Sequence, residues 1–158
     1  MAGMVHVFTG EGKGKTSAAL GIALRAAGHG FRTHITFFMK GEYPYGEQKT
    51  IALLPNIIVA RFGSLEFVDP ANVKPQEREQ ARLALENARI AVQTGRFDLV
   101  ILDEVNVAAA WKLIDVKEVI RFIKERPENV ELILTGRYAD KDVIALADYV
   151  TEMKEIKH

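Results

Sequence analysis

The chain has 158 residues, of which 48% are hydrophobic and 27% charged, a composition typical of one globular domain with a hydrophobic core. Its 21 basic residues balance 21 acidic ones, which removes the electrostatic argument for a nucleic-acid or membrane-surface protein but leaves room for a local basic pocket. The sequence has no cysteine, so disulfides, thiolate catalysis and cysteine-based metal centres are excluded. Neither a signal peptide nor an apolar run of roughly 20 residues is visible. We therefore expect a single cytoplasmic domain, residues 1–158, with no nucleic-acid or membrane partner.

Strand and helix patterns alternate along the chain. The expected strands are apolar or β-branched runs at residues 5–9, 33–38, 57–62, 99–102, 130–135 and 149–153. The expected helices carry alanine-rich or amphipathic patterns at residues 17–27, 75–94, 116–123 (ending before Pro127) and 141–147. This alternation predicts an α/β fold of the P-loop NTPase type, with a mostly parallel sheet and helices on both faces. The segment 40–74, rich in glycine, proline and aromatic residues, stays unassigned, and loops of that kind often carry function.

A glycine-rich sequence, G-E-G-K-G-K-T, connects the first strand to the first helix at residues 10–16. Glycine tolerates the positive φ angles that turn backbone N–H groups toward phosphate oxygens, and the start of a helix adds partial positive charge. Lys15 can reach the outer phosphates, and Thr16 can place its hydroxyl on Mg²⁺. Compared with the general pattern G-x-x-x-x-G-K-[ST], the first glycine comes one residue late, at Gly10, and Thr9 holds the usual position. The strand before and the helix after favour a nucleotide-binding loop over an ordinary glycine-rich turn.

Two acids, Asp103 and Glu104, follow the apolar strand 99–102. In a parallel sheet the carboxyl ends of the strands line the ligand crevice, and acids there hold the magnesium ion of P-loop proteins. Successive strand residues point to opposite faces, so both acids can face a metal only if the strand ends between them. A solvated acidic turn is the alternative, which the nearby phosphate loop disfavours. Arg137, in T-G-R after the strand 130–135, would reach the same edge, where an arginine can contact phosphate oxygens.

The sequence shows no pairing of a nucleophile with a general base. The four histidines, His6, His29, His34 and His158, have no partner at metal-ligand spacing. This pattern points to chemistry driven by positioning and leaving-group stabilisation, or to a very strong nucleophile.

Seven short segments occur in an order and spacing that characterise one enzyme family. They are G-E-G-K-G-K-T-S-A-A-L-G (10–21), R-A-A-G-H-G (25–30), F-F-M-K-G (37–41), F-D-L-V-I-L-D-E (97–104), R-P (126–127), T-G-R (135–137) and A-D-Y-V-T-E-M (147–153). Over nearly its whole length the chain resembles the P-loop type of ATP:corrinoid adenosyltransferase, and the late first glycine is itself the pattern of that family.

The resemblance implies transfer of the 5′-deoxyadenosyl group of ATP to the cobalt(I) of cobalamin or cob(I)yrinic acid a,c-diamide, with release of triphosphate. It implies ATP and a reduced corrinoid as substrates, Mg²⁺ or Mn²⁺ as cofactor, a flavoprotein reductase that supplies cobalt(I), and a homodimer. By the same resemblance Lys15, Thr16 and Glu104 are catalytic, and Thr16 and Glu104 hold the metal. The residues implied to bind ATP are Gly10, Glu11, Gly12, Lys13, Gly14, Lys15, Thr16, Ser17, Arg25 and Arg137.

The chain departs from the family pattern at two places. Thr36 stands where the family usually has glutamine before its F-x-K-G segment, and the usual Thr-Trp pair is replaced by F-G-S-L-E-F at residues 62–67. Phe62 or Phe67 could face the corrinoid in place of that tryptophan; alternatively, both belong to the core of a short strand and loop. Two other functions stay open at this point: a P-loop ATPase or small-molecule kinase, and a non-catalytic module that binds ATP or a corrinoid.

Overall fold

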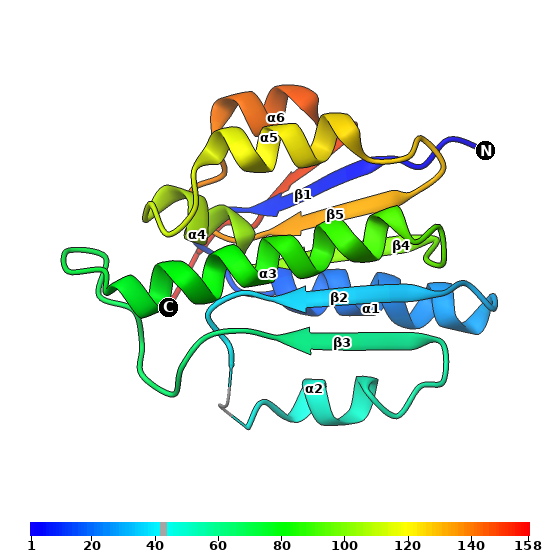
Figure 1. Ribbon diagram of the computed structural model, residues 1–158, viewed down its shortest axis with the longest axis horizontal. Helices are drawn as coiled ribbons and strands as arrows, with labels where there is room; N and C mark the ends of the chain where they lie inside the picture. The colour runs from blue at the N-terminus through cyan, green and yellow to red at the C-terminus, as the bar shows by residue number, and fades with distance from the viewer. Residues whose placement is uncertain (42–43) are drawn as a thin grey trace.

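One parallel sheet forms the centre of the computed structural model, which describes residues 1–41 and 44–158 (Figure 1). Within these residues the strand order is β3-β2-β4-β5-β1-β6, and every pairing is parallel. The strands are β1 (Val5–Thr9), β2 (Thr33–Phe37), β3 (Ile57–Arg61), β4 (Leu99–Asp103), β5 (Glu131–Thr135) and β6 (Tyr149–Glu152). The predicted α/β fold is confirmed, and the sheet is parallel throughout.

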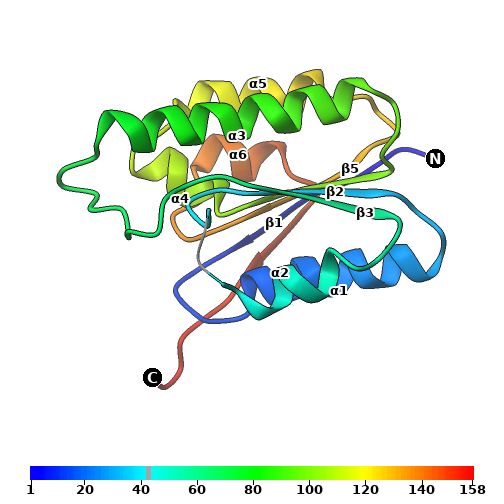
Figure 2. The same ribbon diagram turned by 60° about the horizontal axis from the view of Figure 1, so that its bottom comes forward.

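Helices cover both faces of the sheet (Figure 2). On one face lie α1 (Lys15–Gly28) and α2 (Gly46–Ile51); on the other lie α3 (Pro75–Gln93), α4 (Val105–Ala110), α5 (Val116–Glu125) and α6 (Lys141–Leu146). All predicted strands and helices are present, whereas the short helices α2 and α4 were not predicted. None of the helices in the described part of the chain is long and apolar enough to cross a bilayer.

Strand β4 shows why the sheet is buried on both faces. Its residues alternate between two hydrophobic clusters: Leu99 and Ile101 pack with residues of α1, while Val100 and Leu102 pack with residues of α3 and α5. All five residues of β4 are buried. The continuous apolar run of this strand therefore reflects burial on both sides, as is usual in parallel sheets.

The carboxyl ends of the strands carry most of the unusual backbone conformations. Among the described residues, four non-glycine residues have a positive φ: Met39, Glu104, Lys112 and Tyr138. Met39, Glu104 and Tyr138 lie within three residues of the ends of β2, β4 and β5. Such conformations are uncommon for residues with a Cβ and concentrate at functional sites. The same edge of the sheet holds the phosphate loop.

Candidate active site

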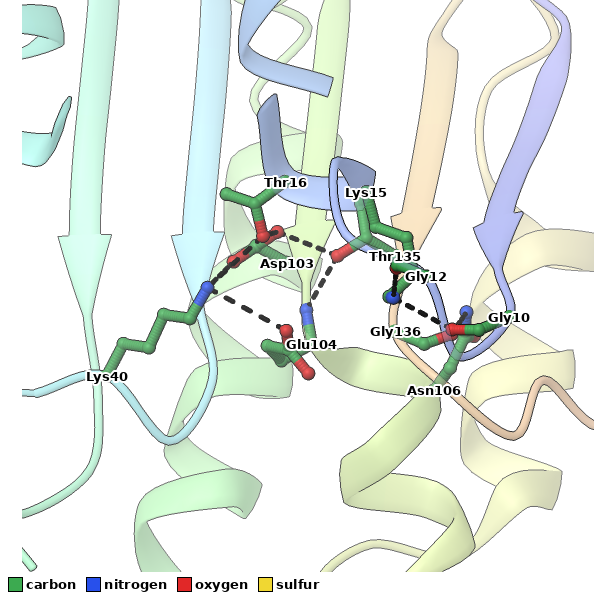
Figure 3. A network of polar contacts seen from close by, with 10 residues as sticks. All are labelled: Gly10, Gly12, Lys15, Thr16, Lys40, Asp103, Glu104, Asn106, Thr135 and Gly136. Atoms are coloured by element: carbon green, nitrogen blue, oxygen red, sulfur yellow. Dashed lines mark hydrogen bonds and ion pairs between the residues drawn. The ribbon is translucent and has the colours of Figure 1, made fainter. Parts of the chain in front are cut away.

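The phosphate loop, residues 10–16, runs from the end of β1 into the first turn of α1 (Figure 3). Gly10 and Gly14 have φ angles of 98° and 108°, in the left-handed region that favours glycine. Gly14 is the N-cap of α1, and no acidic side chain occupies the first turn of that helix. The partial positive charge of the helix start is therefore available to an anion bound at the loop.

Lys15 is buried within this loop. Its Nζ donates hydrogen bonds to the carbonyl oxygens of Gly10 at 2.8 Å and Gly12 at 2.5 Å. Burial lowers the pKa of Lys15 and the positive charge of Arg137 lowers it further, while nearby carboxylates partly offset both effects. The loop carbonyls thus hold the ammonium group in place beside the cavity that Lys15 lines.

Gly12 has a different role from the one its motif suggests. Its N–H donates to the carbonyl oxygen of Met153 at 2.7 Å, in the segment that follows β6, so this N–H is not turned toward a phosphate. A Cβ on Gly12 would lie 2.8 Å from the Lys154 backbone, and one on Gly10 would lie 2.4 Å from the Met153 oxygen. These two glycines allow the loop to pack closely against the segment after β6.

The two acids after β4 both face the site because the strand ends between them. Strand β4 stops at Asp103, and Glu104 takes a left-handed conformation with a φ of 66°. Asp103 is fully buried, and its Oδ1 accepts hydrogen bonds from the hydroxyls of Thr16 at 2.9 Å and Thr135 at 2.7 Å. The Thr135 hydroxyl in turn accepts the backbone N–H of Glu104 at 2.9 Å. Thr135, at the end of β5, therefore connects the two acids and fixes the turn between them.

Lys40 completes this cluster and was not assigned a role from the sequence. Its Nζ lies 2.6 Å from Asp103 Oδ2, 3.2 Å from Thr16 Oγ1 and 3.8 Å from Glu104 Oε1 (Figure 3). Burial alone would lower the pKa of Lys40, but the charges of Asp103 and Glu104 together with the hydrogen bond raise it above its ordinary value. Lys40 is therefore a largely shielded cation, with 14% of its side chain exposed, between the acids and the phosphate loop.

The electrostatic balance of the site is visible at Glu104. Burial raises its pKa and the adjacent charge of Asp103 raises it further, while Lys40, Lys15 and Arg137 act in the opposite direction. The site holds four cationic side chains (Lys13, Lys15, Lys40 and Arg137) and three carboxylates (Glu11, Asp103 and Glu104), with Glu11 3.6 Å from Arg137. The surplus of positive charge suits a polyphosphate.

A cavity of about 420 Å³ opens between the phosphate loop and the turns after β2 and β4. Its walls include ten residues named from the sequence: Glu11, Gly12, Lys13, Gly14, Lys15, Thr16, Ser17, Phe67, Glu104 and Arg137. They also include six that sequence reasoning missed: Met39, Lys40, Tyr45, Val68, Val107 and Trp111. Polar and charged groups gather on the loop side, and apolar and aromatic groups come from α4 and from the segment around Phe67.

Two residues named from the sequence lie elsewhere. Arg25 is exposed on α1, ten positions after Lys15 or about 15 Å along a helix. It lines a separate cavity with Met1 and Phe31, so the structure does not bring it to the phosphate loop. Phe62 packs against the hydrophobic core beneath α3, as the core alternative expected.

Phe67 behaves in the opposite way. Its side chain is 85% exposed and borders the cavity. Of the two phenylalanines named for corrinoid contact, Phe67 is the one that reaches the site.

The side chains at the end of β4 suit a divalent cation. The Thr16 hydroxyl and the carboxylates of Asp103 and Glu104 are oxygen donors, and the Lys40 ammonium already places one positive charge among them. Mg²⁺ is typically held by one or two carboxylates together with substrate phosphates. The described part of the chain contains no group of three acidic or histidine side chains able to enclose a metal. The remaining ligands of a divalent cation here would come from substrate phosphate oxygens or from water.

Comparison with known proteins gives a consistent result. The family model of ATP:corrinoid adenosyltransferase BtuR/CobO/CobP matches residues 1–158. The chain is 33% identical over 156 residues to the corrinoid adenosyltransferase of Escherichia coli (strain K12), covering 99% of this chain and 79% of that protein. It is 36% identical over 165 residues to the corrinoid adenosyltransferase of Sinorhizobium sp, covering 99% and 74%.

Among solved structures, the chain is similar to EssC (ATPases 2 and 3) from Geobacillus thermodenitrificans, with a TM-score of 0.56 at 13% identity. The match covers 98% of this chain and 32% of that one, and at this identity it shows the fold alone. The family match along the whole sequence, together with the two identities above 30%, shows that this chain belongs to the ATP:corrinoid adenosyltransferase family.

Proposed function

We propose that the protein transfers the 5′-deoxyadenosyl group of ATP to the cobalt(I) of a corrinoid and releases triphosphate. The observation that carries this proposal is the division of the cavity into a cationic wall and an apolar one. Family membership gives the reaction class, and the two walls suggest where each substrate lies.

The cationic wall suits the triphosphate as a leaving group. The phosphate loop, the start of α1, Lys15, Lys40 and Arg137 lie on one side of the cavity. Once the substrates are bound, positive charges on that side stabilise the negative charge that develops on the departing oxygen, and they need no further rearrangement during the reaction. When bound, Mg²⁺ would be held by Thr16, Glu104 and Asp103 and would neutralise triphosphate charge.

The apolar wall suits a large, flat corrinoid. Met39, Phe67, Val68, Val107 and Trp111 border the cavity. Aromatic side chains offer wide apolar contact surfaces, and Phe67 and Trp111 contribute such surfaces to this wall. We propose that the corrinoid packs here with its cobalt directed toward the C5′ carbon of ATP.

The reaction balances without a proton transfer. Cobalt(I) donates an electron pair to C5′, a cobalt–carbon bond forms, and the C5′–O bond breaks with its electrons leaving on triphosphate. Cobalt is formally oxidised from (I) to (III). The protein therefore needs to hold two substrates in line and to neutralise charge, rather than to supply a nucleophile or base.

The proposal is tested by incubating the protein anaerobically with ATP, MgCl₂ and chemically reduced cobalamin, and by quantifying adenosylcobalamin and triphosphate. We expect the two products in equal amounts, and their loss in Lys15→Ala but not in Lys49→Ala, which removes an exposed charge from α2. ADP with phosphate or a phosphorylated product would indicate an ATPase or kinase. Tight binding of both substrates without turnover would indicate a binding module.

We propose three further features of the protein: its oligomeric state, its source of cobalt(I) and its location in the cell. We propose a homodimer, which sedimentation would measure, and a flavoprotein reductase that delivers cobalt(I), which replacement of the chemical reductant by a reduced flavoprotein would test. We also expect the protein to act in the cytoplasm, where fractionation of cells would find it.

A further inference from the structure

We propose that Lys40 is a built-in counter-ion of the metal site. In the nucleotide-free protein its ammonium takes the place of the divalent cation, and it moves away when the metal and the triphosphate bind together. The inference rests on the proposed function, because it assigns the metal to Thr16, Asp103 and Glu104.

The first support is the position of the ammonium. Lys40 Nζ contacts Asp103 Oδ2 at 2.6 Å and Thr16 Oγ1 at 3.2 Å, and Glu104 Oε1 is 3.8 Å away. These are the three side chains that suit Mg²⁺. The side chains of Lys40 and Asp103 are only 14% and 1% exposed, so water screens this ion pair weakly.

The second support is the backbone that carries Lys40. The preceding residue, Met39, has a φ of 58°, which a residue with a Cβ rarely adopts. The segment is fixed on both sides, because Phe38 N–H donates to the Asp103 carbonyl at 3.0 Å and Lys40 N–H donates to the Phe62 carbonyl at 3.0 Å. The strained turn after β2 is therefore anchored to β4 and β3, and it directs Lys40 inward. Strain of this kind points to a functional position.

The third support is that the ammonium and a divalent cation cannot share these oxygens. Two cations on the same carboxylate repel each other, and Asp103 Oδ1 is already used by Thr16 and Thr135. Lys40 also borders the cavity, so it has space to turn toward a bound triphosphate, whose oxygens would replace Asp103 as its partner. A metal that binds alone must displace Lys40 from Asp103 without giving the ammonium a new partner. When triphosphate binds with the metal, its oxygens become that partner.

This exchange has a functional consequence. Free divalent cations would bind weakly to the resting enzyme, and the acids would not be left unpaired in its interior. The metal site would form only when the leaving group is present.

The test is a titration with MnCl₂ alone, followed by electron paramagnetic resonance, on the wild type, Lys40→Met and Lys40→Gln. Lys40 Nζ lies within 3.8 Å of all three ligand side chains. A unit charge and a doubly charged ion about 4 Å apart repel strongly enough, even with water-like screening, that removing the lysine charge should tighten Mn²⁺ binding about thirtyfold. Inorganic triphosphate, added as a second ligand, should bind less tightly to both variants than to the wild type. Lys49→Met, which removes an exposed lysine of α2, should match the wild type in both titrations.

The thermal unfolding of the same proteins gives an independent readout. In EDTA the Lys40→Met variant should unfold at a lower temperature than the wild type, since the buried carboxylate of Asp103 loses its cationic partner. MnCl₂ should then restore more stability to the variant than to the wild type. If Lys40→Met does not fold in EDTA, folding should appear as MnCl₂ is added.

Equal Mn²⁺ affinities of the wild type and both Lys40 variants would overturn the proposal. So would stability of the variants that does not respond to MnCl₂. None of these measurements contains a corrinoid, so failure of adenosyl transfer and failure of the counter-ion role are distinguished.

Discussion

Replacing Thr135 with valine tests whether the two acids are positioned by one hydroxyl. Thr135 is fully buried at the end of β5, and its hydroxyl donates to Asp103 Oδ1 at 2.7 Å while it accepts Glu104 N–H at 2.9 Å. Valine has nearly the same shape, so Thr135→Val removes both hydrogen bonds without creating a large cavity. A hydrogen bond to a charged group contributes about 1.5–3 kcal/mol, and a buried N–H left unpaired costs about 1–3 kcal/mol.

Because the Glu104 N–H is only partly buried and Asp103 keeps its bond from Thr16, we expect Thr135→Val to lower the free energy of unfolding by about 2–3 kcal/mol. Urea denaturation with an unchanged m-value measures this loss. Thr151→Val, the same substitution at an exposed position of β6, is the control and should change the value by less than about 0.5 kcal/mol. A loss below about 0.5 kcal/mol in Thr135→Val would refute the reasoning. The variant should also require more MgCl₂ for half-maximal adenosyl transfer, since Glu104 is less firmly held.

Three further predictions use other parts of the molecule. Gly12→Ala should destabilise the protein and weaken ATP binding, because its Cβ would lie 2.8 Å from the backbone after β6. Gly21→Ala has open space around it in α1 and should instead stabilise the protein by about 0.5–1 kcal/mol. Urea denaturation and ATP titration of both variants measure these effects. Burial lowers the pKa of His34 below its ordinary value of 6.5, so the unfolded chain takes up this proton first as the pH falls. Stability should therefore be retained above pH 6.5 and decline below it, and His34→Gln should flatten this decline in denaturation curves from pH 8 to 5; an unchanged decline would contradict it. Phe67→Ala should raise the KM for the corrinoid without altering stability, whereas Phe62→Ala should lower the free energy of unfolding by about 2 kcal/mol. If Phe62→Ala raised the KM and Phe67→Ala did not, the corrinoid would bind elsewhere.

The fold was predictable because its strands are apolar runs and its long helices carry clear patterns. The alternation of Leu99 to Leu102 between two clusters is the physical basis of the run that predicted β4. Helices α2 and α4 were missed because each has only six residues and begins without a capping side chain, whereas the equally short α6 begins after the capping residue Asp140. The P-loop was predictable because its backbone takes positive φ angles at Gly10 and Gly14, which favour glycine and so leave a mark in the sequence.

The rest of the site depends on tertiary contacts that sequence spacing does not encode. Lys40 reaches Asp103 only because β2 and β4 are neighbours in the sheet, with Phe37 paired to Asp103. Trp111 joins the cavity wall because it follows the unpredicted helix α4. The signal that could have found Lys40 was the F-F-M-K-G segment itself, where a charged residue follows a buried strand at the same edge as the phosphate loop.

Lys40 and the phosphate loop both line the part of the cavity that we assign to the triphosphate leaving group. We propose that triphosphate departs intact when the adenosyl group moves to cobalt. The most direct measurement follows ATP labelled with ³²P at the γ-phosphate during a single turnover with reduced cobalamin under anaerobic conditions. We expect all the label released from ATP to appear as triphosphate, in a 1:1 ratio to adenosylcobalamin. Label in orthophosphate, or in a phosphorylated product, with ADP as its partner would contradict the account.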